Sequence, residues 1–172
     1  MRITPLAWLA ATGALGCYGA PPPSEMEVTF DPCQPLVVDV APEASEEELA
    51  SIEDALDMWN EIADTRLTTR DLEFAERVSV GFDEAAPLFY GVYLPDDGEI
   101  LINEVMSGRH RRAVVVAHEI GHAFGMWHVE ERTSVMNPGN TSVEPVQEDI
   151  AYLEELWGSC VRAPAAPDTP TP

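Results

Sequence analysis

The feature that most constrains this chain is a set of histidines at metal-binding spacing. Residues 118–128 read HEIGHAFGMWH, and an apolar stretch, AVVVA at 113–117, leads directly into them. That continuity predicts one buried helix from about Arg111 to Phe124. Because residues four positions apart lie on the same face of a helix, the imidazoles of His118 and His122 can reach one metal ion.

Gly125 and His128 complete the predicted metal site. Glycine adopts positive φ without steric penalty, so the helix can end there and the chain can turn back to present His128 as a third ligand. Three neutral histidines leave one tetrahedral position of a zinc ion open for water, as in catalytic sites. Glu119 is predicted to take a proton from that water as it attacks a carbonyl, and to pass the proton to the leaving amine. The predicted chemistry is peptide hydrolysis.

The pattern H-E-x-x-H-x-x-G-x-x-H with a downstream methionine resembles the metzincin metalloendopeptidases. From average residue usage, a chance match to the histidines, glutamate and glycine in a chain of this length comes to about 10⁻⁵. The run Ser134-Val135-Met136-Asn137-Pro138 resembles the Met-turn as matrixins carry it. The assignment of Met136 to the base of the zinc site rests on this resemblance alone.

The resemblance implies a mixed α/β (α+β) fold of the metzincin-like zincin type. Its parts are a twisted, mostly parallel sheet with one antiparallel edge strand, an active-site helix, the Met-turn and a C-terminal helix. Sequence patterns predict strands at 36–40, 77–82, 88–94 and 99–103, a helix that begins with the capping box Ser45-Glu46-Glu47-Glu48, and a closing helix at 146–158. In the matrixin order, 88–94 is the edge strand along which an extended substrate would pair.

Departures from the matrixin pattern limit what the resemblance implies. The segment between Leu94 and Glu99 lacks the ligands with which matrixins hold a second zinc and calcium, so one catalytic zinc is predicted. No EF-hand loop or repeat of acidic ligands supports structural calcium. The residues after His128 do not settle the metzincin subfamily, and those between Pro138 and Pro145 do not identify a preferred substrate side chain.

The first residues read as an export signal. A basic end at Arg2 precedes an apolar run to Gly16, which is too short to span a bilayer comfortably. Ala14-Leu15-Gly16-Cys17 resembles a bacterial lipoprotein box, with its leucine displaced by one position. We expect lipidation at Cys17 and attachment to the bacterial cell envelope; ordinary cleavage near Ala20 and secretion is the alternative.

The other two cysteines flank the expected domain. Removal of Cys17 leaves Cys33 and Cys160 as a pair, and a disulfide between them would stabilise the fold by about 4–5 kcal/mol in the chain-entropy model. The surroundings of Cys33 also resemble, weakly, the inhibitory cysteine of matrixin propeptides, but little chain precedes it. The predicted organisation is a signal peptide at 1–16, a lipidation site and proline-rich tether at 17–34, a catalytic domain at 35–161 and a disordered tail at 162–172.

The chain is strongly acidic, with 31 acidic and 9 basic residues in 172 and a formal charge of −22. Nucleic acid is therefore an improbable partner, because phosphate binding needs basic surface. Protein or peptide substrates, a monomeric state and a membrane contact only through Cys17 are expected. Two function classes stay open: an exported zinc endopeptidase, and a non-catalytic lipoprotein that zinc stabilises. Glu119 favours the first, because three histidines alone would suffice for a structural ion.

Overall fold

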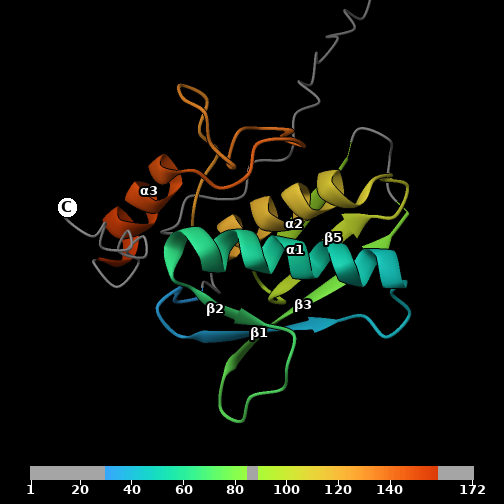
Figure 1. Cartoon of the computed structure of the whole chain (residues 1–172). Helices are drawn as coiled ribbons and strands as arrows, with labels where there is room; N and C mark the ends of the chain where they lie inside the picture. The colour runs from blue at the N-terminus through green and yellow to red at the C-terminus, as the bar shows by residue number, and fades with distance from the viewer. Residues whose placement is uncertain (1–29, 85–88, 159–172) are drawn as a thin grey trace, which may run out of the picture.

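The computed structural model describes residues 30–84 and 89–158. Two helices lie side by side over one face of a sheet, and a third lies near the C-terminal end of α1 (Figure 1). The elements in chain order are β1 (Pro35–Val40), α1 (Glu46–Ala63), β2 (Arg66–Thr68), β3 (Glu76–Asp83), β4 (Gly91–Leu94), β5 (Glu99–Asn103), α2 (Arg109–Ala123) and α3 (Gln147–Trp157).

The five strands form one mixed sheet in the order β2-β1-β3-β5-β4. All neighbouring pairs are parallel except β4 and β5, which run antiparallel with Tyr93 opposite Ile100. The predicted α/β fold with one antiparallel edge strand is confirmed. Because β4 lies at the edge and α2 packs against it, the sheet brings a strand with no second strand partner in the described ranges next to the histidine-bearing helix.

Alternating side chains decide which face of the sheet is buried. In β3, Val78 and Val80 are buried while Arg77 and Ser79 are exposed. This is the period-two pattern of a strand with one covered face. The apolar side chains face α1 and α2 and form the core.

Helix α1 begins at the predicted capping box. The backbone N–H of Glu48 donates to the Ser45 hydroxyl at 3.3 Å, and the Glu48 carboxylate accepts from the Ser45 N–H at 2.8 Å. Trp59 then joins this helix to α2: it is fully buried, its indole N–H donates to the Ala117 carbonyl at 2.9 Å, and its ring meets Phe124 edge to face at 5.9 Å. These contacts fix the helix that carries the histidines.

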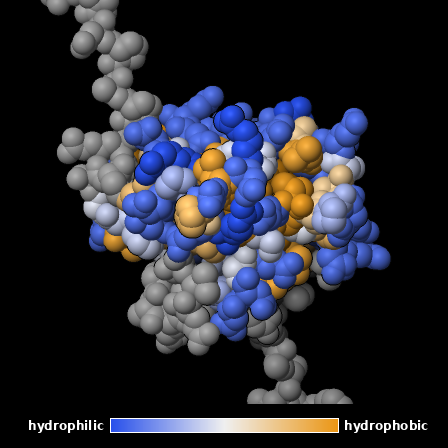
Figure 2. All heavy atoms as spheres, turned by 90° about the horizontal axis from the view of Figure 1, so that it is seen from below, coloured by the Kyte–Doolittle hydropathy of each residue, from blue (hydrophilic) through white to orange (hydrophobic). Residues whose placement is uncertain are grey.

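The face of the molecule seen from below is mostly hydrophilic, with separate apolar patches (Figure 2). Arg77 pairs with Asp39 at 2.7 Å on the exposed side of the sheet, and also contacts Asp71. Acidic side chains on this face thus lie in solvent, and some of them pair with a basic side chain.

The predicted helices and strands fall within a few residues of those observed. Helix α2 begins two residues before the expected Arg111, and β4 is shorter than predicted, since it begins at Gly91. Strand β2 was not predicted, because its three residues carry no alternation that a sequence pattern can detect. No helix in the described ranges is long and apolar enough to cross a bilayer. The signal peptide, Cys17, Cys160 and the tail lie outside the described residues.

Candidate metal centre

Helix α2 and the turn after it bring three histidines together. His118 and His122 lie one turn apart with ring centroids 4.8 Å from each other. The helix ends at Ala123, and Gly125 adopts a φ of 88°, which reverses the chain. The His128 ring then lies 5.2 Å from the His118 ring and 5.0 Å from the His122 ring. The turn predicted at Gly125 is confirmed, and the three ligand nitrogens lie within 4.8 Å of one another.

Backbone carbonyls orient two of these rings. His118 Nδ1 lies 2.7 Å from the Val135 oxygen, and His122 Nδ1 lies 2.8 Å from the Met126 oxygen. A carbonyl only accepts, so each Nδ1 carries the proton and each Nε2 presents a lone pair. Carbonyl partners of this kind hold metal-ligating histidines in one tautomer. The two ring orientations are therefore set before any ligand arrives.

The lone pairs converge at a distance that suits one ion. His118 Nε2 lies 3.2 Å from His128 Nε2. Two nitrogens bound to one tetrahedral zinc at roughly 2.0–2.1 Å would lie about 3.3–3.4 Å apart. This pair of nitrogens thus has the spacing of two ligands of one zinc ion, and imidazole is a ligand that zinc prefers.

Burial keeps the histidines neutral. It lowers the pKa of His118 to about 4 and that of His122 to about 3, because the charged imidazolium loses its hydration. Burial also lowers the pKa of His128, although the nearby Glu130 opposes that shift. Neutral imidazoles at pH 7 are the form that binds a metal ion.

Glu119 lies beside the histidines and is also buried, with 5% of its surface exposed. Burial raises the pKa of its carboxyl to about 8, and a hydrogen bond from the Tyr93 backbone partly opposes this rise. The glutamate is pressed against β4: a Cβ added at Gly91 would lie 2.9 Å from Glu119 Oε1. Its position is therefore fixed by the edge strand as well as by its own helix.

Met136 lies fully buried in the turn that follows the histidines. Its backbone carbonyl accepts a hydrogen bond from the Val129 N–H at 3.0 Å. The residue before it, Val135, supplies the carbonyl that orients His118. This turn thus contacts the histidine cluster through its backbone, at His118.

Sequence reasoning missed Asp149, which anchors this turn. Its carboxylate accepts hydrogen bonds from the Ser134 hydroxyl, from the Val135 N–H at 3.0 Å and from the Val146 N–H at 2.9 Å, and it is fully buried. The available signal was an acidic residue at the third position of α3, where a side chain can cap the helix start. Its contacts with the turn are tertiary and leave no sequence signal.

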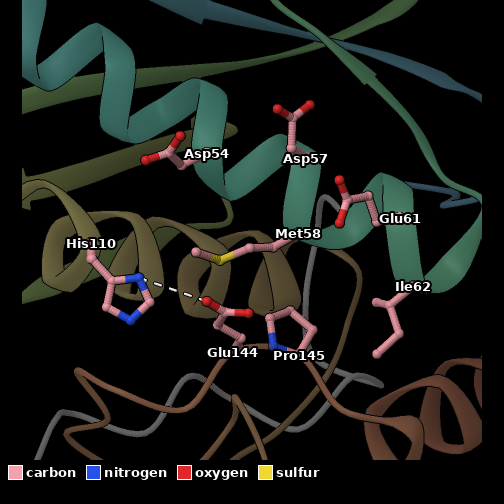
Figure 3. Close-up of a pocket in the computed structure, with 8 residues that line it drawn as sticks. All are labelled: Asp54, Asp57, Met58, Glu61, Ile62, His110, Glu144 and Pro145. Atoms are coloured by element: carbon pink, nitrogen blue, oxygen red, sulfur yellow. Dashed lines mark ion pairs between the residues drawn. The ribbon is translucent and has the colours of Figure 1, made fainter.

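The first two residues of α2, Arg109 and His110, face acidic side chains. Arg109 makes two hydrogen bonds to Asp54, at 2.6 and 2.5 Å, which offset its charge at the helix start. His110 faces Glu144 at 3.7 Å across a hollow of about 580 Å³ between α1 and the segment before α3 (Figure 3). His110 is thus an exposed residue that faces a carboxylate. None of the three clustered histidines lines this hollow.

Residues 92–158 match the family model of the matrixins. The site-bearing part of the chain is matrixin-like. Matrix metalloproteinase-27 from Homo sapiens is 36% identical over 63 residues, and that from Tupaia belangeri is 34% identical over 62. The human alignment covers 34% of this chain and the other covers 33%, but each covers 12% of the relative. The chain thus spans only a small part of these relatives.

Among solved structures, High choriolytic enzyme 1, a hatching enzyme zinc-protease from Oryzias latipes, aligns over 75% of this chain and 92% of its own. The TM-score is 0.49 and the sequence identity 15%. The matrixin-like segment begins in β4 and ends after α3, so it contains the histidines, Glu119 and Met136. The resemblance predicted from the motif is confirmed by the family match.

Proposed function

We propose that this chain is a zinc-dependent endopeptidase that hydrolyses peptide bonds of extracellular or envelope proteins. The observation that carries the proposal is the juxtaposition of three converging neutral imidazoles with one buried carboxyl group, Glu119. In this proposal His118, His122 and His128 bind one zinc ion, which supplies Lewis-acid chemistry at the site. The matrixin-like segment supports the same assignment.

Glu119 is proposed as the catalytic acid–base group. Its carboxylate takes a proton from the attacking water and later gives the proton to the amine of the departing peptide. A bound dication favours the charged form of a neighbouring carboxyl, so it counteracts the rise in pKa that burial causes. The Tyr93 N–H and the contact with Gly91 hold the carboxylate in place through both transfers.

An extended substrate is proposed to lie along β4. Within the described residues this strand pairs only with β5, so its outer edge has no strand partner. A peptide that adds to such an edge gains backbone hydrogen bonds and presents alternate side chains to the protein. Since Glu119 packs against β4, such a peptide would pass close to the carboxyl group.

Export and domain limits belong to the same proposal. The basic and apolar start supports a signal peptide at 1–16, and Cys17 in its lipoprotein-like box supports lipidation. The catalytic unit is proposed as 35–161, acting as a monomer. Cys33 is disulfide-bonded, but its partner lies outside the described residues, so the pairing with Cys160 stays a prediction.

The test is hydrolysis of an unbiased peptide library by the purified full-length chain loaded with zinc. A Glu119→Gln variant and a chelated sample serve as negative controls, and Glu104→Gln, at an exposed position, serves as the matched control. Cleavage by the wild type and by Glu104→Gln, with loss of about 10²-fold or more in Glu119→Gln, supports the endopeptidase. If no sample cleaves the library although zinc binds, the result favours the alternative function, a non-catalytic lipoprotein that zinc stabilises.

A further inference from the structure

The loop between β2 and β3 exposes an aromatic side chain in a strained turn. Phe74 is 95% exposed and has a φ of 69°. It occupies the third position of a turn in which the Ala75 N–H donates to the Leu72 carbonyl at 3.4 Å, and glycine is usual at this position of a type II turn. Positive φ is unfavourable for a bulky residue. Within the described part of the chain, burial of the ring does not offset this strain.

A hollow of about 380 Å³ adjoins the Phe74 ring. It is lined by the loop, by the first residue of β1 and by the residue before that strand: Gln34, Pro35, Leu72, Glu73, Phe74 and Glu76. The loop projects from the sheet on the side opposite α1 and α2 (Figure 1). None of the three clustered histidines lines this hollow. It is therefore a surface feature distinct from the metal centre, with apolar walls and two carboxylates beside them.

The C-terminal segment, residues 161–172 with the sequence VRAPAAPDTPTP, has complementary chemistry. Pro164, Pro167 and Pro170 recur at every third position. A polyproline II helix has three residues per turn, so in that conformation the three rings lie on one face. Proline faces of this kind bind aromatic-lined grooves, because the conformation is already extended and loses little entropy. Arg162 supplies the positive charge that suits the two carboxylates of the hollow.

The two ends of the described chain lie close together at the end of α2. Trp157, the last residue of α3, donates its indole N–H to the Phe124 carbonyl at 2.8 Å. The Phe30 N–H donates to the carbonyl of the residue before Phe124, also at 2.8 Å. Three residues span at most about 11 Å. The three residues that follow Trp157 can therefore bring Cys160 close to Cys33.

A disulfide at Cys33 links these ends beside the hollow. Cys33 is disulfide-bonded, and the other cysteines of the chain are Cys17 and Cys160. The proximity of the chain ends favours Cys160 as the partner. Because Cys33 directly precedes Gln34 in the wall of the hollow, this disulfide would hold the start of the C-terminal segment at the edge of the hollow. The four residues from Cys160 to Pro164 span up to about 14 Å, which suffices to enter it.

We propose that the C-terminal segment docks in the polyproline II conformation into the hollow at Phe74, with Arg162 against the carboxylates of Glu73 and Glu76. The occupant is thus a part of the same chain, held by a disulfide between Cys33 and Cys160. Such a short tether gives the segment an effective concentration in the millimolar range, so individually weak contacts suffice. The tail that composition predicts to be disordered is ordered by this contact. The inference goes beyond the proposed endopeptidase function and does not depend on it.

The test is nuclear magnetic resonance of the oxidised, isotope-labelled full-length chain at two concentrations. Docking predicts nuclear Overhauser effects between the Phe74 ring and the protons of Pro164 or Pro167, and their absence would overturn the proposal. If these effects appear only at the higher concentration, the segment binds a second copy of the chain, and the proposal is wrong. Peptide mapping of the same sample locates the disulfide. A link between Cys17 and Cys33 would remove the tether and would also contradict the proposal.

Variants identify the surface that holds the segment. Phe74→Gly removes the ring and suits the positive φ of the turn, and it should lower the backbone order parameters of Ala165 and Ala166 from above to below about 0.6. Val105→Gly is the matched control: it removes another exposed apolar side chain, outside the hollow, and should leave these values unchanged. If the segment stays ordered in Phe74→Gly, it binds elsewhere and the assignment of the hollow is wrong.

Replacement of the three spaced prolines tests the other partner in the contact. Alanine at positions 164, 167 and 170 keeps the length of the segment and its arginine but removes the face of proline rings. The Overhauser effects to the Phe74 ring should disappear, and the order parameters should fall as in Phe74→Gly. Pro172→Ala, which lies outside the run of three prolines, is the control and should behave as the wild type. Unchanged order in the triple variant would show that the proline face does not make the contact.

Discussion

Gly121 and Met136 are packed so closely that any side chain at position 121 would occupy the space of the Met136 sulfur. Gly121 lies on α2 between the two helical histidines, directly before His122. Met136 follows Val135, whose carbonyl orients the His118 ring. Because Gly121 has no side chain, the turn that contains Met136 can approach α2. This approach places the Val135 carbonyl where it accepts a hydrogen bond from His118.

Replacement of Gly121 by alanine is expected to weaken metal binding and stability together. Alanine is intrinsically better in a helix by about 1 kcal/mol, but overpacking against Met136 costs about 1–3 kcal/mol. Displacement of the turn would also move the Val135 carbonyl away from His118, and loss of such a partner typically lowers metal affinity by about 10–100-fold. Urea unfolding of the zinc-free protein and competition for zinc with a chelator measure the two effects.

A double-mutant cycle isolates the contact between these residues. If the methionine sulfur is the obstacle, Gly121→Ala should be less damaging in a Met136→Ala background than in the wild type. Strictly additive changes in the free energy of unfolding would show that the two residues are not coupled.

Asp149 is predicted to stabilise the same turn through its charge. Asp149→Asn can keep its amide oxygen on the Val135 and Val146 N–H groups and donate from its NH₂ group to the Ser134 hydroxyl, which then accepts instead of donating, so all three hydrogen bonds lose their charged partner. Hydrogen bonds to charged groups contribute about 1.5–3 kcal/mol, so a loss of roughly 2–4 kcal/mol in unfolding free energy is expected. Glu148→Gln, an exposed position on the same helix turn, should change stability by less than about 0.5 kcal/mol. Similar losses in both variants would refute the role of Asp149.

Local sequence patterns predicted those parts of the site that depend on local geometry. The four-residue spacing of His118 and His122 and the glycine turn before His128 follow from helix geometry, and the capping box at Ser45 from side-chain chemistry. Three other features depend on how α2, β4 and the loop before α3 meet: the packing of Gly121 against Met136, the anchoring of the turn by Asp149, and the close approach of Glu119 to β4. Such distances between segments far apart in the chain leave no periodic signal in one sequence.

The purified protein is predicted to hold one zinc ion per chain. In the ranges 30–84 and 89–158, the one group of three or more metal-ligating side chains close enough to hold an ion is the histidine triad. Elemental analysis after dialysis should therefore return about one zinc per chain, and His128→Ala should lose most of it because two ligands remain. His110→Ala, a histidine outside the triad, is the control and should retain full occupancy. Two zinc ions per chain would contradict the prediction.

The stability of the zinc-free protein is predicted to be greatest near pH 6.5. The folded pKa values of His118 and His122 are about 4 and 3, against 6.5 for an ordinary histidine, and that of His128 is also lowered. As pH falls below 6.5 the unfolded chain binds protons that the folded chain cannot, so stability is lost progressively toward pH 3–4. These histidines therefore stabilise the fold only above their unfolded pKa.

Glu119 contributes with the opposite sign. Its folded pKa is about 8 against an ordinary 4.5, so its contribution is fully present below pH 4.5 and is lost as pH rises to 8, by up to about 1.4 kcal/mol per pH unit. Between pH 4.5 and 6.5, the stability gained from the histidines as pH rises exceeds the stability lost through Glu119. Above pH 6.5, only the loss through Glu119 remains. Urea unfolding of the chelated protein from pH 4 to 9 should show this maximum. Glu119→Gln should remove the loss between pH 6.5 and 8 and keep the acid limb, because the amide does not titrate; an unchanged alkaline limb would mean that Glu119 is not held protonated in the metal-free fold.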